Sequence, residues 1–241
     1  MPMYNDKKIA CIIPARMSSS RFPNKPLSKI LGRALVLRVA DIAKSVKYFD
    51  RIIVATEDDI IKETVEKEGY EAMLTSKHYT CTHRVAEVAS QLLDDYIFNL
   101  QGDEPLVIKD ELEYIIEYGI DNEYDMVQPC RISTQEEIKD PDSVQMIVNN
   151  GKVLHLQREP DTITDNLVTQ IGMYFYKREV IADFPNLDMT WVKYWKGLDT
   201  IGFCGRYDVI PLELKTNTQA IDRPHHIHLV EKKLLENSDS I

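Results

Sequence analysis

The first half of the chain alternates between short apolar runs and longer segments whose apolar residues recur at helical spacing. The apolar runs, each of strand length, are Ile9–Ile13, Arg51–Thr56, Glu71–Leu74 and Tyr96–Leu100. Helical spacing is found in Ala34–Val46, Asp58–Glu68 and Arg84–Leu93. Because strands and helices that alternate in this way form βαβ units, the pattern predicts an α/β fold with a mostly parallel, doubly wound sheet.

The second half is less regular and richer in strand signals. It predicts strands at Met126–Cys130, Ser143–Asn149, Lys152–Leu156, Gln170–Tyr176 and Asp208–Leu214, helices at Lys109–Tyr118 and Pro224–Leu235, and a partly helical Trp191–Tyr207. The turn Asn149-Asn150-Gly151 joins two of these strands as a hairpin. Since no linker or repeat interrupts the chain, we expect one domain over residues 1–241 with an inserted β-rich lobe at roughly 124–177.

The loop that follows the first strand concentrates cations and hydroxyl groups. Pro14 is expected to end the strand, because proline cannot donate to the next ladder position. Beyond it lie Arg16, Ser18, Arg21 and Lys25. Such groups suit a polyphosphate, and loops at the carboxyl ends of parallel strands are where α/β sheets bind ligands. A loop whose cations face only water is the alternative.

Composition narrows the class of partner. The 241 residues carry a formal net charge of -10, with 44% hydrophobic and 28% charged residues. A chain this acidic is not expected to bind nucleic acid or an anionic membrane surface. Its four cysteines are far apart, and no apolar run approaches membrane-spanning length. We therefore expect a soluble, cytoplasmic protein without a disulfide or zinc framework.

Carboxylates follow the fourth predicted strand and precede the last predicted helix. In Gln101-Gly102-Asp103-Glu104-Pro105, an acid beside a glycine suits a hard divalent cation. Taken alone, Asp103 also fits a solvated turn and Asp222 fits a helix cap, so both interpretations stay open. The cluster His225-His226-x-His228 has no carboxylate or cysteine close in sequence to complete a metal site.

Two segments together resemble a known family. The first loop follows PAR-x4-R-x-P-x-K-P-L over Pro14–Leu27, and Asn99–Pro105 follows N-x-Q-G-D-E-P. These strings resemble the sugar-acid cytidylyltransferases, in particular those that act on 3-deoxy-manno-octulosonate (KDO). The resemblance covers most of the chain and is dense in Ile9–Leu31, Arg51–Thr56, Asn99–Pro105 and Gly172–Tyr176. It implies a Rossmann-like nucleotidyltransferase fold, a homodimer built on the inserted lobe, and Mg²⁺ as cofactor.

The resemblance also implies roles for particular side chains. Arg16, Lys25 and Asp103 would be catalytic, and Asp103 would bind magnesium with Asp222, which lies in a segment like the family's V-D-T-P. Arg84 lies in a segment like S-G-T-D/E-R, although there it also fits an ordinary surface arginine. The residues that this likeness assigns to the nucleotide are Pro14, Ala15, Arg16, Met17, Ser18, Arg21, Lys25, Thr82, Arg84 and Gln101.

The segments that would bind the acceptor depart from the family. Gln170 stands where the family has a histidine beside the sugar acid, and Gly197–Thr200 replaces the family's L-E-Q-L-R. The residues expected at the acceptor are Gln101, Arg158, Gln170, Tyr174 and Asp199. Because glutamine cannot become cationic and Asp199 adds a negative charge, we expect an amino-substituted acidic sugar to be used better than KDO itself.

The function implied is transfer of CMP from CTP to the anomeric hydroxyl of KDO or an amino-substituted analogue, with release of pyrophosphate, for lipopolysaccharide or surface glycan synthesis. The hydroxyl would attack the α-phosphorus in line, without a covalent intermediate on the protein. One alternative is a CTP-dependent enzyme for another nonulosonic acid or a phosphonate. The other is a nucleotide-binding regulatory module without turnover, against which the presence of both carboxylates argues.

Overall fold

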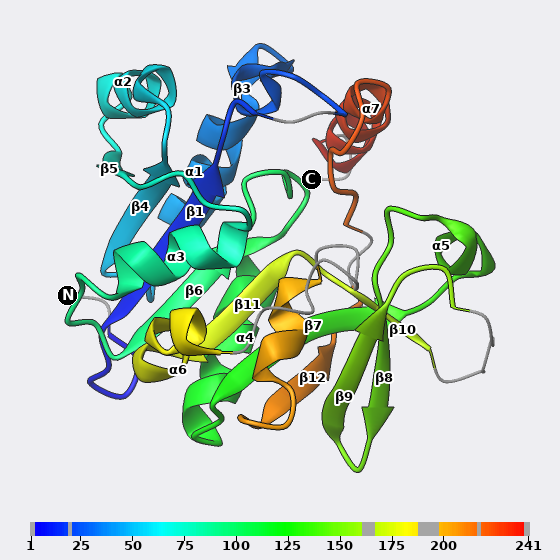
Figure 1. Cartoon of the computed structure of the whole chain (residues 1–241). Helices are drawn as coiled ribbons and strands as arrows, with labels where there is room; N and C mark the ends of the chain where they lie inside the picture. Colours follow the sequence, from blue (N-terminus) through cyan, green and yellow to red (C-terminus); the bar gives the residue numbers. More distant parts are fainter. Residues whose placement is uncertain (1–2, 19–20, 161–166, 188–197, 216–217, 239–241) are drawn as a thin grey trace.

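The computed structural model describes residues 3–18, 21–160, 167–187, 198–215 and 218–238. The strands of its main sheet are β1 (Ile9–Ala15), β4 (Arg51–Thr56), β5 (Glu71–Leu74), β6 (Tyr96–Leu100), β7 (Met126–Ile132), β8 (Gln145–Asn149), β9 (Lys152–Gln157), β10 (Val168–Gln170), β11 (Met173–Lys177) and β12 (Val209–Glu213). They form a ten-stranded sheet in the order β5-β4-β1-β6-β11-β7-β10-β8-β9, with β12 paired to β7 (Figure 1). A separate short hairpin consists of β2 (Lys29–Ile30) and β3 (Arg33–Ala34).

The first half of the sheet is parallel, as predicted. β1 pairs in parallel with β4 and β6, and β4 pairs in parallel with β5. β11 is antiparallel to both β6 and β7, whereas β12 is parallel to β7. β8 and β9 form an antiparallel hairpin, which β10 joins to β7. The mostly parallel α/β fold is therefore confirmed, while the inserted lobe at 124–177 stays a prediction.

Helices cover both faces of the sheet. They are α1 (Leu35–Ser45), α2 (Asp59–Lys67), α3 (Cys81–Ala89), α4 (Lys109–Asp121), α5 (Gln135–Lys139), α6 (Arg178–Ala182) and α7 (His226–Ser238), with 3-10 turns η1 (Lys25–Leu27), η2 (Phe184–Asn186) and η3 (Asp199–Phe203). Alternate residues of β1 enter two cores, because successive side chains of a strand point to opposite faces. One core contains α1, α2 and α4, and the other contains α3 and α6, which lie in front of the sheet in Figure 1.

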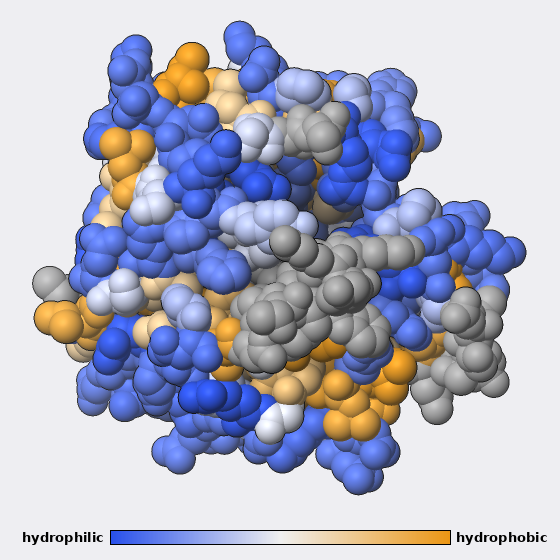
Figure 2. Space-filling model, viewed as in Figure 1, coloured by the Kyte–Doolittle hydropathy of each residue, from blue (hydrophilic) through white to orange (hydrophobic). Residues whose placement is uncertain are grey.

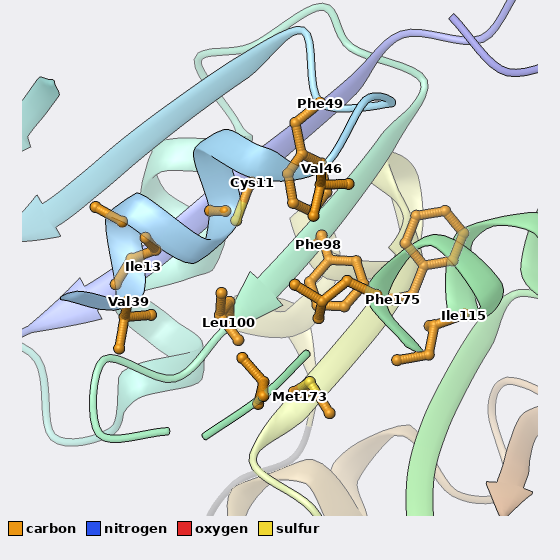
Figure 3. Packing of buried hydrophobic residues seen from close by; sticks show 14 of the residues in the cluster. Cys11, Ile13, Val39, Val46, Phe49, Phe98, Leu100, Ile115, Met173 and Phe175 are labelled. Carbon is orange, nitrogen blue, oxygen red and sulfur yellow. The ribbon is translucent and has the colours of Figure 1, made fainter. Parts of the chain in front are cut away.

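The core beneath α1 and α4 is built on aromatic side chains. Figure 3 shows Phe98 of β6 next to Phe175 of β11, with ring centroids 6.0 Å apart. Phe49 meets Phe98 edge to face at 5.4 Å. These packed rings fix β6 against β11 and so set the position of the loop that follows β6.

The surface seen in Figure 2 is mostly hydrophilic, with apolar residues in scattered patches.

Two predicted strand boundaries were wrong, one because of sheet pairing and the other because of a long-range hydrogen bond. Pro14 does not end β1, which continues to Ala15 and stays paired with β4. β1 pairs with β6 only over Ile9–Ile12, so at Pro14 it has β4 as its one neighbour. A proline is tolerated at such a position, because its missing N–H need not bond to a second strand. The predicted strand Gln170–Tyr176 is interrupted at Gly172, whose N–H donates to Glu104 Oε1 over 3.1 Å.

Helix ends differ less. α3 begins at Cys81, earlier than predicted, because Thr80 Oγ1 accepts the His83 N–H and caps the helix. α7 begins at His226. Of the partly helical segment predicted at Trp191–Tyr207, residues 191–197 lie outside the described part, and η3 supplies a helical turn in the remainder.

Candidate active site

A cavity opens at the carboxyl ends of β1 and β6, where parallel sheets bind ligands. Its larger part has a volume of about 860 Å³ and its smaller part about 180 Å³. Both parts are lined by Arg16, Arg21, Cys81, Gln101, Asp103 and Asp222, so they form one continuous site. Pro14, Ala15 and Lys25 line the smaller part. Several predicted nucleotide residues therefore share one cavity with both predicted metal ligands.

A lysine and two carboxylates form the centre of this site. Lys25 opens η1 directly after Asn24, whose φ of 60° lies in the left-handed region that asparagine tolerates. Lys25 Nζ lies 2.6 Å from Asp103 Oδ2 and 4.0 Å from Asp222 Oδ1. Burial alone would lower the pKa of Lys25, but the two acids outweigh it and raise this pKa above its ordinary value.

The backbone brings the two carboxylates together across the length of the chain. The Ile221 N–H donates to the Asp103 carbonyl oxygen over 2.9 Å, which places Asp222 beside the loop after β6. Burial and then the neighbouring Asp103 charge raise the pKa of Asp222. Gly102 is required in this loop, since a Cβ there would lie 2.9 Å from the Pro14 carbonyl oxygen. Asp103 is thereby held against the end of β1.

The carboxylate pair fits a magnesium ion. Within the described residues, no group of three or more histidine, cysteine, aspartate or glutamate side chains could hold a metal. Magnesium, however, needs only one or two protein carboxylates when phosphate oxygens and water complete its octahedron. Asp103 and Asp222 already converge on one cation, the Lys25 ammonium, so they can also share a bound metal.

Two arginines of the first loop reach the site by different contacts. Arg21 binds Asp142 with one nitrogen and Asp222 with another, the latter over 2.9 Å. Arg16 Nη1 donates to the Tyr79 carbonyl oxygen over 3.5 Å, across the cavity from the loop. Because the side chain of Arg21 is 45% exposed, a phosphate can reach its guanidinium.

The first loop is anchored to the end of β4. The Met17 N–H donates to Asp58 Oδ2 over 2.8 Å, and Ser18 Oγ donates to Glu57 Oε1 over 3.4 Å. Met17 and Ser18, both predicted at the nucleotide, are not among the described residues that line either part of the cavity. Across the cavity, Thr80, Cys81 and Thr82 line the wall at the start of α3. Arg84 is not among the described residues that line either part of the cavity; it is fully buried behind them.

The remaining predicted residues line the larger part of the cavity. Gln170 Nε2 donates to the Tyr174 hydroxyl, so these two side chains form one polar unit. Arg158 Nη1 donates to the carbonyl oxygens of Asp142 and Pro141 over 2.5 and 3.2 Å. Burial, followed by the charge of Arg21, lowers the pKa of Arg158. The side chain of Asp199, also predicted here, lies outside the described part of the structure.

Among the lining residues that the sequence did not predict at this site are Glu104, Asp142 and His226. Glu104 is buried and accepts the Gly172 N–H, and burial followed by the Asp103 charge raises its pKa to about 7. Asp142 accepts from Arg21 and from Arg223 Nε, the latter over 2.9 Å. His226 Nδ1 lies 3.2 Å from the Asp222 nitrogen and 3.1 Å from the Ala220 oxygen. The QGDEP string could have revealed Glu104, whereas no local pattern marks Asp142.

Comparison with known proteins agrees over nearly the whole chain. Residues 10–193 match a family described as Cytidylyltransferase. A 3-deoxy-manno-octulosonate cytidylyltransferase of Thermodesulfovibrio yellowstonii is 31% identical over 248 residues, covering 93% of this chain and 97% of that protein. An 8-amino-3,8-dideoxy-manno-octulosonate cytidylyltransferase of Shewanella woodyi is 31% identical over 240 residues, covering 94% and 98%. A solved CMP:2-keto-3-deoxy-manno-octonic acid synthetase complexed with CTP aligns with a TM-score of 0.86 and 26% identity, over 95% of this chain and 99% of that one.

Proposed function

The chain belongs to the cytidylyltransferase family, and we propose that it transfers CMP from CTP to the anomeric hydroxyl of an acidic eight-carbon sugar, releasing pyrophosphate. The observation that carries this proposal is the meeting of Asp103, Asp222 and Lys25 in a cavity at the carboxyl ends of β1 and β6. The likeness to a synthetase complexed with CTP, which covers 95% of this chain, supports the proposal. Lipopolysaccharide or another surface glycan is the destination that a KDO-type product implies.

Arg16, Arg21 and Lys25 would bind the triphosphate and orient it. Arg21 forms ion pairs with Asp142 and Asp222 in this structure. When CTP binds, its phosphate oxygens would replace one or both carboxylates as partners of Arg21. The nucleotide would also be contacted from the first loop by Pro14, Ala15, Met17 and Ser18, and from the start of α3 by Thr82. Transfer then depends on holding the acceptor hydroxyl in line with the α-phosphorus and on neutralising charge on the phosphate oxygens.

Asp103 and Asp222 would hold Mg²⁺, the cofactor that fits their oxygen donors. When bound, the metal would neutralise phosphate oxygens and lower the pKa of the acceptor hydroxyl. Lys25 lies close enough to both carboxylates to keep them in place before the metal binds. With Mg²⁺ held by the two acids, the Lys25 ammonium would bind the triphosphate.

The acceptor is proposed to be KDO or its amino-substituted analogue, since relatives with each of these names match at equal identity. Arg158, Gln101, Gln170 and Tyr174 would bind it. The neutral Gln170–Tyr174 unit can both donate and accept hydrogen bonds. It therefore favours a sugar substituent that does the same. Another nonulosonic acid or a phosphonate remains the alternative within the same enzyme class.

A homodimer would use the β8–β9 hairpin and the neighbouring end of β7. There Ile132, Ile147 and Leu154 are 63%, 39% and 54% exposed, which suits burial against a second copy.

None of the helices in the described part of the chain combines the length and apolarity that a bilayer crossing needs. The proposed setting is a reducing, cytoplasmic one, in which Cys11, Cys81, Cys130 and Cys204 would stay as thiols.

The test is pyrophosphate release with CTP and Mg²⁺ in the presence of KDO, its 8-amino analogue, another nonulosonic acid or a phosphonate. The proposal predicts acceptor-dependent release with an eight-carbon acidic sugar, and a higher kcat/KM for the amino analogue than for KDO. A clear preference for KDO would contradict only the amino preference. CTP binding without turnover on any acceptor would instead favour the regulatory module.

A further inference from the structure

Arg84 has the largest fully buried side chain in the described part of the protein. Its Nη2 donates to Glu57 Oε2 over 2.6 Å, and its Nε donates to Thr75 Oγ1 over 3.1 Å. Among the described residues, its Nη1 has no hydrogen-bond partner. Burying a guanidinium with an incomplete set of partners is costly, so stability alone explains this ion pair poorly.

Glu57 connects Arg84 to the first loop. It follows β4 directly, and its second oxygen, Oε1, accepts from Ser18 Oγ over 3.4 Å. The next residue, Asp58, accepts the Met17 N–H over 2.8 Å. At the end of β4, Asp58 thus holds the loop backbone directly after Arg16, and Glu57 holds the hydroxyl of the next residue, Ser18. Here the loop must present its N–H groups and cations to phosphate.

The same buried pair also supports the opposite wall. Arg84 lies one turn into α3, whose N-cap Thr80 and first-turn residue Thr82 line the cavity. Through its hydrogen bond to Thr75, Arg84 also connects α3 to the end of the strand β5. A single guanidinium therefore fixes the spacing between the first loop and α3, which is the gap that the nucleotide would fill.

We propose that Arg84 is a positioning residue for nucleotide binding, which acts through Glu57 on the Met17–Ser18 segment without touching the nucleotide. This rests on the proposed function, because the nucleotide is CTP. An arginine is needed here, since its planar fork donates to Glu57 and Thr75 in two fixed directions. A lysine has one ammonium on a flexible stem and cannot reproduce both contacts.

The experiment measures the Kd of CTP with Mg²⁺ by calorimetry for wild type, Glu57→Gln, Arg84→Met and the double variant, together with the KM of the acceptor. Each single variant is expected to weaken CTP binding about 10-fold with little change in the acceptor KM. The double variant should be no worse than the more affected single variant, because both changes break one connection. Glu71→Gln is the matched control: Glu71 also accepts from an arginine, Arg51, but at the other end of β4.

Glu57 is half-buried, so Glu57→Gln is expected to fold even if Arg84→Met does not, and thermal unfolding verifies each variant. A folded Glu57→Gln that binds CTP like wild type would overturn the positioning role. So would additive losses in the double variant, which would indicate direct contact between Arg84 and CTP. A wild-type protein that binds no CTP would instead refute the proposed function itself.

Discussion

The nucleotide side and the acceptor side of the cavity are built in different ways. The nucleotide side is lined by the ends of β1 and β6, which are neighbours in the sheet, and by the start of α3. The acceptor side comes from β10, β11 and the loops at 140–144 and 158, which are held by contacts between distant parts of the chain. Parallel strand order thus fixes one side, whereas side-chain contacts fix the other.

Asp142 lies where the two sides meet. It binds Arg21 of the first loop and Arg223 before α7, while its backbone oxygen accepts from Arg158. Burial alone would raise the pKa of Asp142, but Arg223 and Arg21 outweigh it and hold this pKa below its ordinary value. Asp142 therefore stays ionised at neutral pH. It connects Arg21, which would bind phosphate, to Arg158, which would bind the acceptor.

The largest effect is expected from the metal carboxylates of the nucleotide side. Asp103→Asn and Asp222→Asn should each lower kcat on the order of 10³-fold, because each removes a charged oxygen ligand of Mg²⁺. Pyrophosphate release at saturating CTP measures this. Asp208→Asn is a matched control, since Lys152 Nζ lies 2.6 Å from Asp208 Oδ1, the same separation as Lys25 from Asp103. Full activity in Asp103→Asn would remove that residue from the metal site.

A smaller effect, confined to the acceptor side, is expected from Gln170→His. A histidine can become cationic and pair with a sugar carboxylate, so the KM for KDO should fall several-fold, and more at pH 6 than at pH 8. The Kd for CTP should not change, because Gln170 lines the larger part of the cavity away from Lys25. Steady-state kinetics with each substrate varied would check this. An equal change for CTP would mean that the two sides do not act separately.

The smallest effect concerns the rim of the nucleotide side. Both oxygens of Glu87 accept the Ser76 N–H, at 3.1 and 3.0 Å, and Glu87 also pairs with His78. Burial alone would raise the pKa of Glu87, but His78 and Ser76 outweigh it and hold this pKa below its ordinary value of 4.5. Because the Ser76 contacts are exposed to solvent, Glu87→Gln should cost only about 0.5–1 kcal/mol of stability at neutral pH.

That loss should depend on pH in one direction. A depressed pKa stabilises the fold above pH 4.5, and the contribution disappears as the pH falls through the lower native value. The gap in Tm between wild type and Glu87→Gln should be present at pH 5 and close as the pH falls below about pH 4.5. Thermal unfolding over this range measures it. A gap that persists unchanged at pH 3 would show that the carboxylate charge is not involved.

The sequence predicted the parallel half of the fold closely, because buried strands are short apolar runs. Arg51–Thr56, Glu71–Leu74 and Tyr96–Leu100 have the predicted bounds. The break at Gly172 was missed because its cause, the Glu104 carboxylate, is far away in sequence. A periodic pattern records which face is buried and carries no information on such long-range hydrogen bonds.

The candidate site shows the same division. Asp103, Lys25 and Arg21 were predicted from motifs that resemble a known family, and the structure places all three at one cavity. Arg84 was expected to face the nucleotide, yet it is buried, since the sequence cannot tell whether a cation at a helix start points to solvent or to Glu57. Asp142 was missed because its importance comes from Arg21 and Arg223, which meet only in the folded chain.

The account is tested most directly by a crystal structure with CTP and Mn²⁺, whose anomalous signal locates the metal in place of Mg²⁺. The account predicts the metal on Asp103 and Asp222, with the triphosphate within hydrogen-bond reach of Arg16, Arg21 and Lys25. Arg84 should remain buried on Glu57 in that structure. A metal bound by other residues, or a triphosphate beside Gln170 and Arg158, would contradict the assignment of the two sides.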